Sequence, residues 1–557
     1  MSVSKWYVIA ISAVVALFAV FPLTDTDIWW HLACAREWVI TWTPVREPVV
    51  NVHECFQQTV AFVYNLGGAP LLVAFKAFLW GCVFTLFLWP SVRIMPRNAP
   101  NAPGCHHGRL SSLDGDEPES PLLLAILVVL LFIFRYQFEI RPVLFSLLFL
   151  GIYWNVLPWL FIGAGQERDS QPSCRSGTER KCSDRIHKAK RIALAMLILI
   201  LQFLWCKFQG LYILGPIFAL VFFAQEWWTC RCDGAVVARK TIAFQTCFAV
   251  LLFAMPFFHR EGLNLFLYPF GLLDRLLGLS PSATIFASEI AENRSPITLL
   301  MAGENVLQSA LMIVLCVVGI FAAVLRLRLV FSTSRPWNSH SRSEAEGIHN
   351  FPVEGSRTLW LLVTALLAFV AERNFVLFLP VFFAVLLPWI LQTNGLQNDE
   401  MHSMCASLRM TSHASLVLLA FLFGLWLRSV SNYDSMVACQ RVPVAATQWM
   451  LENPHPGRLF NDDRAGGYLA FMNPSDSTYI DGRFILKTAE FFERYLSYST
   501  DPQTFLHDAD VQNIDRVVLP LRYYARWDKL LSTLDSAENW HLAYRDSLFV
   551  VMDRTGR

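Results

Sequence analysis

Long apolar runs occupy most of this sequence, and no other feature restricts its possible folds as strongly. A helix that crosses the hydrocarbon core of a bilayer needs about 20 apolar residues. The composition agrees, because 55% of the 557 residues are hydrophobic and only 16% are charged, against roughly 25% in soluble domains. We therefore expect a polytopic α-helical membrane protein with about eleven transmembrane helices, at 6–23, 68–90, 121–136, 141–162, 191–206, 209–225, 241–258, 303–325, 358–371, 374–392 and 414–430.

The loops between these spans predict the orientation of the chain, because Lys and Arg concentrate in cytoplasmic loops. The inner loop 163–190 alone has seven of them. The high content of Pro, Gly, Ser and charge in these loops indicates disorder. With the N-terminus inside, eleven crossings place the C-terminus outside, and the inner loops are 91–120, 163–190, 226–240, 326–357 and 393–413.

The composition changes at about residue 431 to that of a soluble domain. We divide the chain into a transmembrane domain, 1–430, with a first outer loop at 24–67, and an extracytoplasmic α/β domain, 431–557. Within the second domain we expect two strands and two helices, at 517–519, 547–552, 488–499 and 523–534.

Ionisable residues gather in the short loops of the predicted outer face. Charges at membrane depth are costly and are usually functional. The alternative is that each residue lies in interfacial water, caps a helix or pairs with a neighbour. Because both signs converge on one face from separate hairpins, we interpret the set as a candidate site, which includes Asp25, Asp27, His31, Glu54, Arg135, Arg141, Lys207, Arg294 and Arg373.

The most informative stretch follows the first span and reads Thr-Asp-Thr-Asp-Ile-Trp-Trp-His-Leu over residues 24–32. Its paired tryptophans and the aromatic character of 29–42 are typical of an amphipathic helix at a membrane interface. Asp25 and Asp27 could bind a divalent cation or act as a general base. The alternative is that an aspartate caps the helix that follows.

Several motifs together resemble the GT-C superfamily, membrane glycosyltransferases that take sugars from polyprenyl-phosphate carriers, and in particular a bacterial branch of integral membrane proteins. The resemblance covers most of the chain. The sequence departs from that branch at 44–51 and at Cys206 and Phe208, where Asn and His are expected. The motifs are Asp-x-Asp-x-Trp-Trp-His-Leu at 25–32, a helix start at 53–56, Arg-Pro-x-x-Phe at 141–145, an altered turn at 205–210, Glu-Arg-Asn-Phe at 372–375, and Asn-Asp, Gly-Gly-Tyr-Leu and Ile-Asp-Gly-Arg at 461–462, 466–469 and 480–483.

This resemblance implies a glycosyltransferase of the bacterial cytoplasmic membrane that moves a sugar from a polyprenyl-phosphate carrier to an extracytoplasmic acceptor. It implies that Asp25 or Asp27 deprotonates the acceptor hydroxyl or holds Mg²⁺ or Mn²⁺. The phosphate leaving group needs cations nearby, so the resemblance assigns substrate and lipid-phosphate binding to the outer-face residues His31, Glu54, Arg135, Arg141, Lys207, Arg294 and Arg373.

Two glycines and a charged turn mark the C-terminal domain. Gly466 and Gly467 predict a tight turn or a close backbone approach. We interpret Asp481 and Arg483 as residues of a turn, with acceptor binding as the functional alternative.

Other classes of protein fit the sequence less well. No Gly-rich phosphate loop follows a strand, so no nucleotide donor is implied, and the net charge of +1 does not indicate a nucleic-acid partner. Transporters place charges at the membrane midplane and contain internal repeats, whereas these charges lie at one surface. A lipid or solute transporter and a non-catalytic membrane scaffold are therefore alternatives to the transferase.

Overall fold

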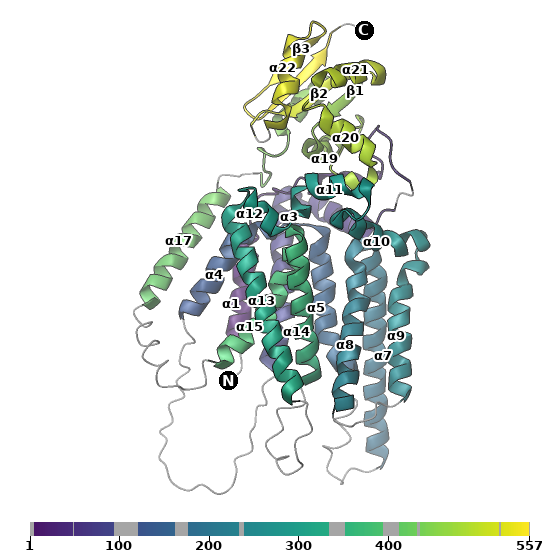
Figure 1. The fold of residues 1–557 in the computed structure, drawn as a ribbon, viewed down its shortest axis with the longest axis vertical. Coiled ribbons are helices and arrows are strands. Elements are labelled where there is room, and N and C mark those ends of the chain that lie inside the picture. The colour runs from purple at the N-terminus through teal and green to yellow at the C-terminus, as the bar shows by residue number, and fades with distance from the viewer. Residues whose placement is uncertain are drawn as a thin grey trace.

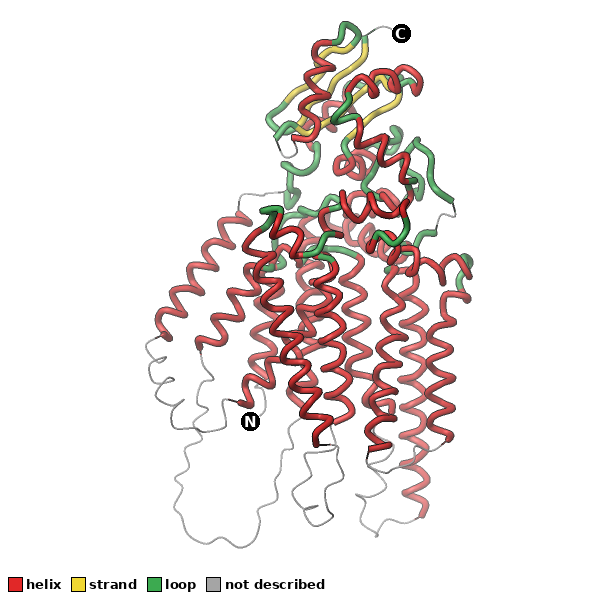
Figure 2. The backbone as a smooth tube through the Cα atoms, viewed as in Figure 1, coloured by secondary structure: helices red, strands yellow, loops and turns green. Residues whose placement is uncertain are grey.

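The chain forms a bundle of long helices with a smaller α/β unit over one of its ends (Figure 1). In this computed structural model the N-terminus lies at the opposite end of the bundle from the C-terminus. Figure 2 shows that the strands belong to the α/β unit. The structure describes residues 5–47, 50–93, 121–161, 177–232, 239–333, 351–393, 411–431, 435–522 and 525–555.

A helix lies at each of the eleven predicted spans. Six helices among the described residues are long and apolar enough to cross a membrane, and shorter apolar helices lie at 7–18, 355–370 and 417–431. The membrane class is therefore confirmed, while the number of crossings stays a prediction. The helices are α1 (Lys5–Phe18), α3 (Glu54–Arg93), α4 (Pro121–Ile133), α5 (Pro142–Phe161), α7 (Gly177–Phe208), α8 (Leu214–Cys232), α9 (Arg239–Ala254), α13 (Val306–Thr333), α14 (Phe351–Val370), α15 (Phe375–Thr393) and α17 (Thr411–Ser431).

Some helices extend beyond their apolar runs. Helix α7 begins at Gly177, so the expected disorder of 163–190 is wrong for its second half. Helix α3 begins at Glu54, as the motif at 53–56 predicts, and it kinks at Gly67 and Gly68, where Gly68 has φ +64°. Backbone of this kind is accessible mainly to glycine.

Most of the predicted inner loops 91–120, 326–357 and 393–413 lies outside the described residues.

The aromatic stretch after the first span forms a shorter helix than expected. Helix α2 covers Asp27–Cys34, and its residues from Ile28 to Cys34 are all buried. The predicted interfacial helix at 29–42 is therefore wrong, because this helix is enclosed by protein on every side. Other short helices lie at the same end of the bundle (Figure 1) and include α10 (Leu263–Leu277), α11 (Thr284–Glu289), η5 (Ala291–Asn293) and α12 (Pro296–Met301).

The α/β unit contains a four-stranded mixed sheet in the order β1-β2-β4-β3. Strand β1 pairs with β2 in parallel, and the other two pairs are antiparallel. The expected strands at 517–519 and 547–552 correspond to β2 and β4, whereas β1 and β3 have no counterpart among the expected strands. The elements are α18 (Val444–Glu452), β1 (Arg458–Asn461), α19 (Asp463–Met472), α20 (Ala489–Ser497), α21 (Pro502–Gln512), β2 (Ile514–Pro520), α22 (Asp528–Ser536), β3 (Trp540–Arg545) and β4 (Phe549–Arg554).

The first outer loop is hydrogen-bonded into the α/β unit. The backbone N–H of Trp42 donates to the carbonyl of Thr478 over 3.0 Å, and the Thr478 N–H donates to the carbonyl of Ile40 over 3.1 Å. The buried ammonium of Lys487 donates to Thr43 Oγ1 over 2.6 Å. These contacts hold the segment that follows α1 between the helical bundle and the sheet.

Candidate functional site

A single arginine connects two carboxylates at the end of the bundle that faces the α/β unit. Arg141 directly precedes α5, Asp25 follows α1, and Glu292 belongs to η5. The Arg141 Nε and Nη2 atoms donate to Asp25 over 2.6 and 3.1 Å. Its Nη1 and Nη2 atoms donate to Glu292 over 2.9 and 2.7 Å. Both carboxylates are thus bound through both of their oxygens, which is the strongest geometry available to an arginine.

Asp27 lies beside this group at the first position of α2. Its backbone N–H donates to Asp25 Oδ1 over 3.2 Å. The N-cap residue of α2 is Thr26, whose side chain makes no capping hydrogen bond, so the alternative of an aspartate as the helix cap is wrong. The Asp27 carboxylate has no ion pair among the described residues. Burial, with a further contribution from the charge of Asp25, raises the pKa of Asp27 to about 7. A carboxyl group with this pKa can exchange a proton near neutral pH.

A glycine of the α/β unit lies directly against Asp27. Gly482 has φ +80°, and a Cβ atom at this position would be 3.3 Å from Asp27 Oδ1. The turn that contains Gly482 is therefore part of the wall of the site, and it brings backbone close to the carboxylate. A side chain at this position would be strained and would lie against that carboxylate.

Close packing of two helices fixes the position of α2. A Cβ atom at Gly467 of α19 would lie 2.7 Å from the backbone nitrogen of Trp30. A Cβ atom at Gly466 would overlap the carbonyl of Ile480. The expectation of a close backbone approach is correct here, whereas the alternative of a tight turn is wrong because both glycines lie inside α19.

A histidine of α2, His31, packs against His53, which directly precedes α3. The rings of His31 and His53 meet edge to face at 5.3 Å between centroids. Burial, followed by the charge of His53, lowers the pKa of His31 well below its usual value. Burial lowers the pKa of His53 to about 4. Both imidazoles are therefore neutral at physiological pH, and His31 Nδ1 is buried with no hydrogen-bond partner among the described residues.

A second buried ion pair supports the turn before Arg141. Lys76 of α3 is fully buried, and its ammonium lies 3.6 Å from Glu139 Oε2. The hydroxyl of Thr24 donates to Glu139 Oε1. Lys76 was not among the predicted site residues, although a lysine inside an apolar span is itself a signal of function.

Arg373 supplies a guanidinium that carries no carboxylate partner in the described part of the chain. Its Nη1 donates to the side-chain oxygen of Asn293 over 3.0 Å. Asn293 is adjacent to Glu292. Against the effect of burial, the charge and hydrogen bond of Arg141 lower the pKa of Glu292, and the charge of Arg373 lowers it further. Arg373 also contributes to the lowered pKa of His53. Asp25, Asp27, His31, Arg141 and Arg373 therefore lie in one electrostatic neighbourhood.

Lys207 and Glu54 form a separate group at the ends of α7 and α3. The ammonium of Lys207 lies 3.1 Å from Glu54 Oε2 and 2.5 Å from Glu261 Oε1. This group borders the histidine pair, because His53 Nδ1 is 3.3 Å from the carbonyl of Phe208. Lys207 is already neutralised by two carboxylates.

Two predicted arginines have other partners. Arg294 donates through both Nη atoms to Glu304, over 3.1 and 2.7 Å. Arg135 donates to the carbonyl of Phe132 over 2.8 Å, and its guanidinium lies 4.1 Å from the centroid of that ring. Within the described residues, neither arginine forms a hydrogen bond or ion pair with Arg141, Asp25 or Asp27.

Asp481 and Arg483 form a buried ion pair within the α/β unit. The Arg483 Nε donates to Asp481 Oδ2 over 3.0 Å, and its Nη1 donates to the carbonyl of Trp38 over 2.8 Å. The guanidinium also lies 4.7 Å from the centroid of the Trp38 ring. Arg483 thus ties the first outer loop to the α/β unit, which agrees with the structural interpretation of this turn.

The arrangement of carboxylates does not fit a divalent cation at Asp25 and Asp27. Among the residues that the structure describes, no group of three or more His, Cys, Asp or Glu could hold a metal ion. Both oxygens of Asp25 accept hydrogen bonds from Arg141, so a metal would have to displace the guanidinium. A divalent cation at Asp25 would therefore compete with the Arg141 guanidinium for the same two oxygens.

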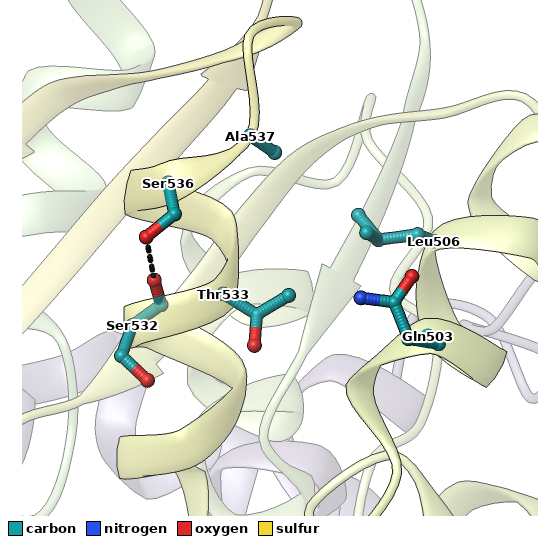
Figure 3. A pocket seen from close by; sticks show the side chains of 6 residues that line it. All are labelled: Gln503, Leu506, Ser532, Thr533, Ser536 and Ala537. Atoms are coloured by element: carbon teal, nitrogen blue, oxygen red, sulfur yellow. Dashed lines mark hydrogen bonds between the residues drawn. The ribbon is translucent and has the colours of Figure 1, made fainter.

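A hollow of about 500 Å³ lies elsewhere, between α21 and α22 of the α/β unit. Figure 3 shows hydroxyl and amide groups on its walls. No predicted site residue contributes to it, and the residues that line it are Gln503, Leu506, Ser532, Thr533, Ser536 and Ala537.

One solved structure with a similar fold is the oligosaccharyltransferase of Archaeoglobus fulgidus in complex with zinc and sulfate. The match covers 95% of this chain and 70% of that chain, with a TM-score of 0.51 and 12% sequence identity. That protein is a GT-C glycosyltransferase, so the expected GT-C fold is confirmed. No protein-family model and no curated protein matches this sequence.

Proposed function

We propose that this protein is a glycosyltransferase that moves a sugar from a polyprenyl-phosphate carrier to an acceptor at the outer face of the bacterial cytoplasmic membrane. The GT-C fold supports a membrane glycosyltransferase in general. The observation that carries the proposal for this chain is the pair of aspartates after α1. Asp25 is bound through both oxygens to Arg141, whereas Asp27 has no ion pair in the described part of the chain.

Asp27 is the proposed general base. The acceptor hydroxyl gives its proton to the Asp27 carboxylate as its oxygen forms a bond to the anomeric carbon of the donor sugar. The bond between that carbon and the phosphate oxygen breaks, and polyprenyl phosphate leaves with the electron pair. The pKa of about 7 suits this role, because a base works best with a pKa near the operating pH.

Arg373 is the proposed partner of the donor phosphate. A leaving phosphate gains negative charge in the transition state and is stabilised by a fixed cation. The Arg373 guanidinium is exposed, and its hydrogen bond to Asn293 leaves other N–H groups to donate. Arg141, by contrast, is held by two carboxylates and serves to position Asp25.

A transfer assay with the full chain in lipid nanodiscs tests the proposal. Purified protein is given a panel of labelled polyprenyl-phosphate sugars and an extract of cell-envelope acceptors. We expect wild type to transfer label and Asp27→Asn to lose about 100- to 10,000-fold in rate, as for other general bases, while still binding polyprenyl phosphate.

Asp528→Asn is the matched control, because Asp528 is an exposed aspartate at the start of α22. It should transfer at the wild-type rate. The proposal is wrong if wild type neither transfers sugar from any donor nor binds polyprenyl phosphate, or if Asp27→Asn is as active as the control.

A further inference from the structure

The Arg141 guanidinium binds two carboxylates, one along its Nε–Nη2 edge and the other along its Nη1–Nη2 edge. Four hydrogen bonds of 2.6 to 3.1 Å reach all four oxygens of Asp25 and Glu292. The two carboxylates come from segments that lie 267 residues apart in the sequence. Such an arrangement neutralises charge and also fixes the angle between the two acids.

The same oxygens are the ones that a divalent cation would need. Mg²⁺ and Ca²⁺ bind carboxylate oxygens at about 2.0 to 2.6 Å, and here each of these oxygens already accepts a hydrogen bond from the guanidinium. A third carboxylate, Asp27, lies two residues from Asp25. Without Arg141, Asp25 and Glu292 would lose the guanidinium that binds them, and the three acids would be left with excess negative charge.

Arg141 also connects the two groups to which the proposed reaction assigns roles. Asp25 accepts a hydrogen bond from the backbone N–H of Asp27 and so helps to orient that residue. Glu292 precedes Asn293, which accepts the hydrogen bond from Arg373. A cation at the position of Arg141 therefore sets the separation between the base and the phosphate-binding guanidinium.

We infer that Arg141 is the resident cation of this site: it takes the position and the positioning role of a divalent metal between Asp25 and Glu292, beside Asp27, so that the site works without one. The positioning role rests on the proposed function, whereas the exclusion of metal does not. Removal of the guanidinium should convert the acidic cluster into a divalent-cation site.

A Mn²⁺ titration of the full chain in nanodiscs tests this inference. Electron paramagnetic resonance detects binding as a loss of the free-ion signal. Wild type should bind no Mn²⁺ that depends on Asp25. Arg141→Met should gain one site, with a dissociation constant of about 10⁻⁴ to 10⁻³ M, as for weak oxygen-ligand sites. The double variant Asp25→Asn, Arg141→Met should lose it again.

Arg294→Met is the matched control, because Arg294 binds a single carboxylate, that of Glu304. It should gain no Mn²⁺ site, and neither should Arg141→Lys, which keeps the positive charge. The inference is overturned if wild type binds Mn²⁺ and Asp25→Asn abolishes that binding, an outcome that does not require the Arg141→Met protein to fold. It is also overturned if folded Arg141→Met binds no more Mn²⁺ than wild type.

The transfer assay gives a second readout. Wild-type activity should be unchanged after treatment with EDTA and after addition of Mg²⁺ or Mn²⁺. Activity that disappears with EDTA and returns with Mg²⁺ would overturn the inference. A wild type with no transfer activity would instead count against the proposed function, and the Mn²⁺ measurement would still decide the role of Arg141.

Discussion

Replacing Gly467 by alanine should disturb the proposed site from a distance, through the contact between α19 and α2. The added Cβ would lie 2.7 Å from the nitrogen, 3.0 Å from the Cβ and 3.2 Å from the Cα of Trp30. Ordinary contacts of this kind are 3.4–4 Å. The obstructing atoms belong to the backbone or are fixed to it, so no rotamer change relieves the overlap and one helix has to move.

The cost should fall at the upper end of the range for overpacking, about 3 kcal/mol. With an unfolding entropy of about 2.1 cal/mol/K per residue, the unfolding temperature of a 557-residue chain that unfolds as one unit should fall by about 3 °C. Asp27 lies one turn before Trp30 on the same helix, so it would move as well. A displacement of about 1 Å in a catalytic group can reduce the rate about 100-fold.

Thermal unfolding of the purified protein at one fixed scan rate, together with the transfer assay, measures both effects. Gly271→Ala is the control, because Gly271 lies in α10 and a Cβ there would meet no atom within 4 Å. This control should be as stable as wild type, or slightly more so. A Gly467→Ala protein that unfolds at the wild-type temperature and transfers sugar at the wild-type rate would refute the reasoning.

Three further predictions concern charged groups. The pKa of Asp27 is raised to about 7, so its base form is lost as the pH falls through 7. The value of kcat/KM should therefore drop by up to about tenfold per pH unit below 7. A flat pH profile of kcat/KM between pH 6 and 8 would contradict the role of Asp27. Arg373→Gln should weaken binding of polyprenyl phosphate about 10- to 100-fold, the effect of losing a charge-assisted hydrogen bond, and titration in nanodiscs checks this; unchanged affinity would remove Arg373 from the phosphate site. Asp481→Asn leaves Arg483 buried without its ion-pair partner, which should cost about 3–5 kcal/mol and lower the unfolding temperature, whereas an unchanged temperature would show that the pair contributes nothing.

The helical part of the fold could be predicted because length and hydropathy alone determine where an apolar helix can form. Helix α5 begins at Pro142, directly after the Arg-Pro motif, and α3 begins at Glu54. The ends that face the predicted inner side were less predictable. Helix α7 continues through a charged, polar stretch, which hydropathy cannot distinguish from a loop.

The pairing of the charged residues could not be predicted, because it depends on contacts between distant segments. Arg141 and Arg294 look equivalent in the sequence, yet Arg141 binds two carboxylates of the candidate site and Arg294 binds only Glu304. The burial of α2 could not be predicted from the sequence either, because a pair of tryptophans is equally typical of a membrane interface and of a packed core.

The hydrogen bonds between the first outer loop and the α/β unit also determine when the site can form during synthesis. The indole N–H of Trp42 donates to the carbonyl of Leu459, which lies 417 residues later in the chain. At about 5–20 residues per second, a ribosome needs about 20–80 s to make that intervening sequence. For this time Asp25 and Asp27 are already synthesised but have no α19 to pack against, and a chain that stops before residue 459 contains both aspartates without a completed site.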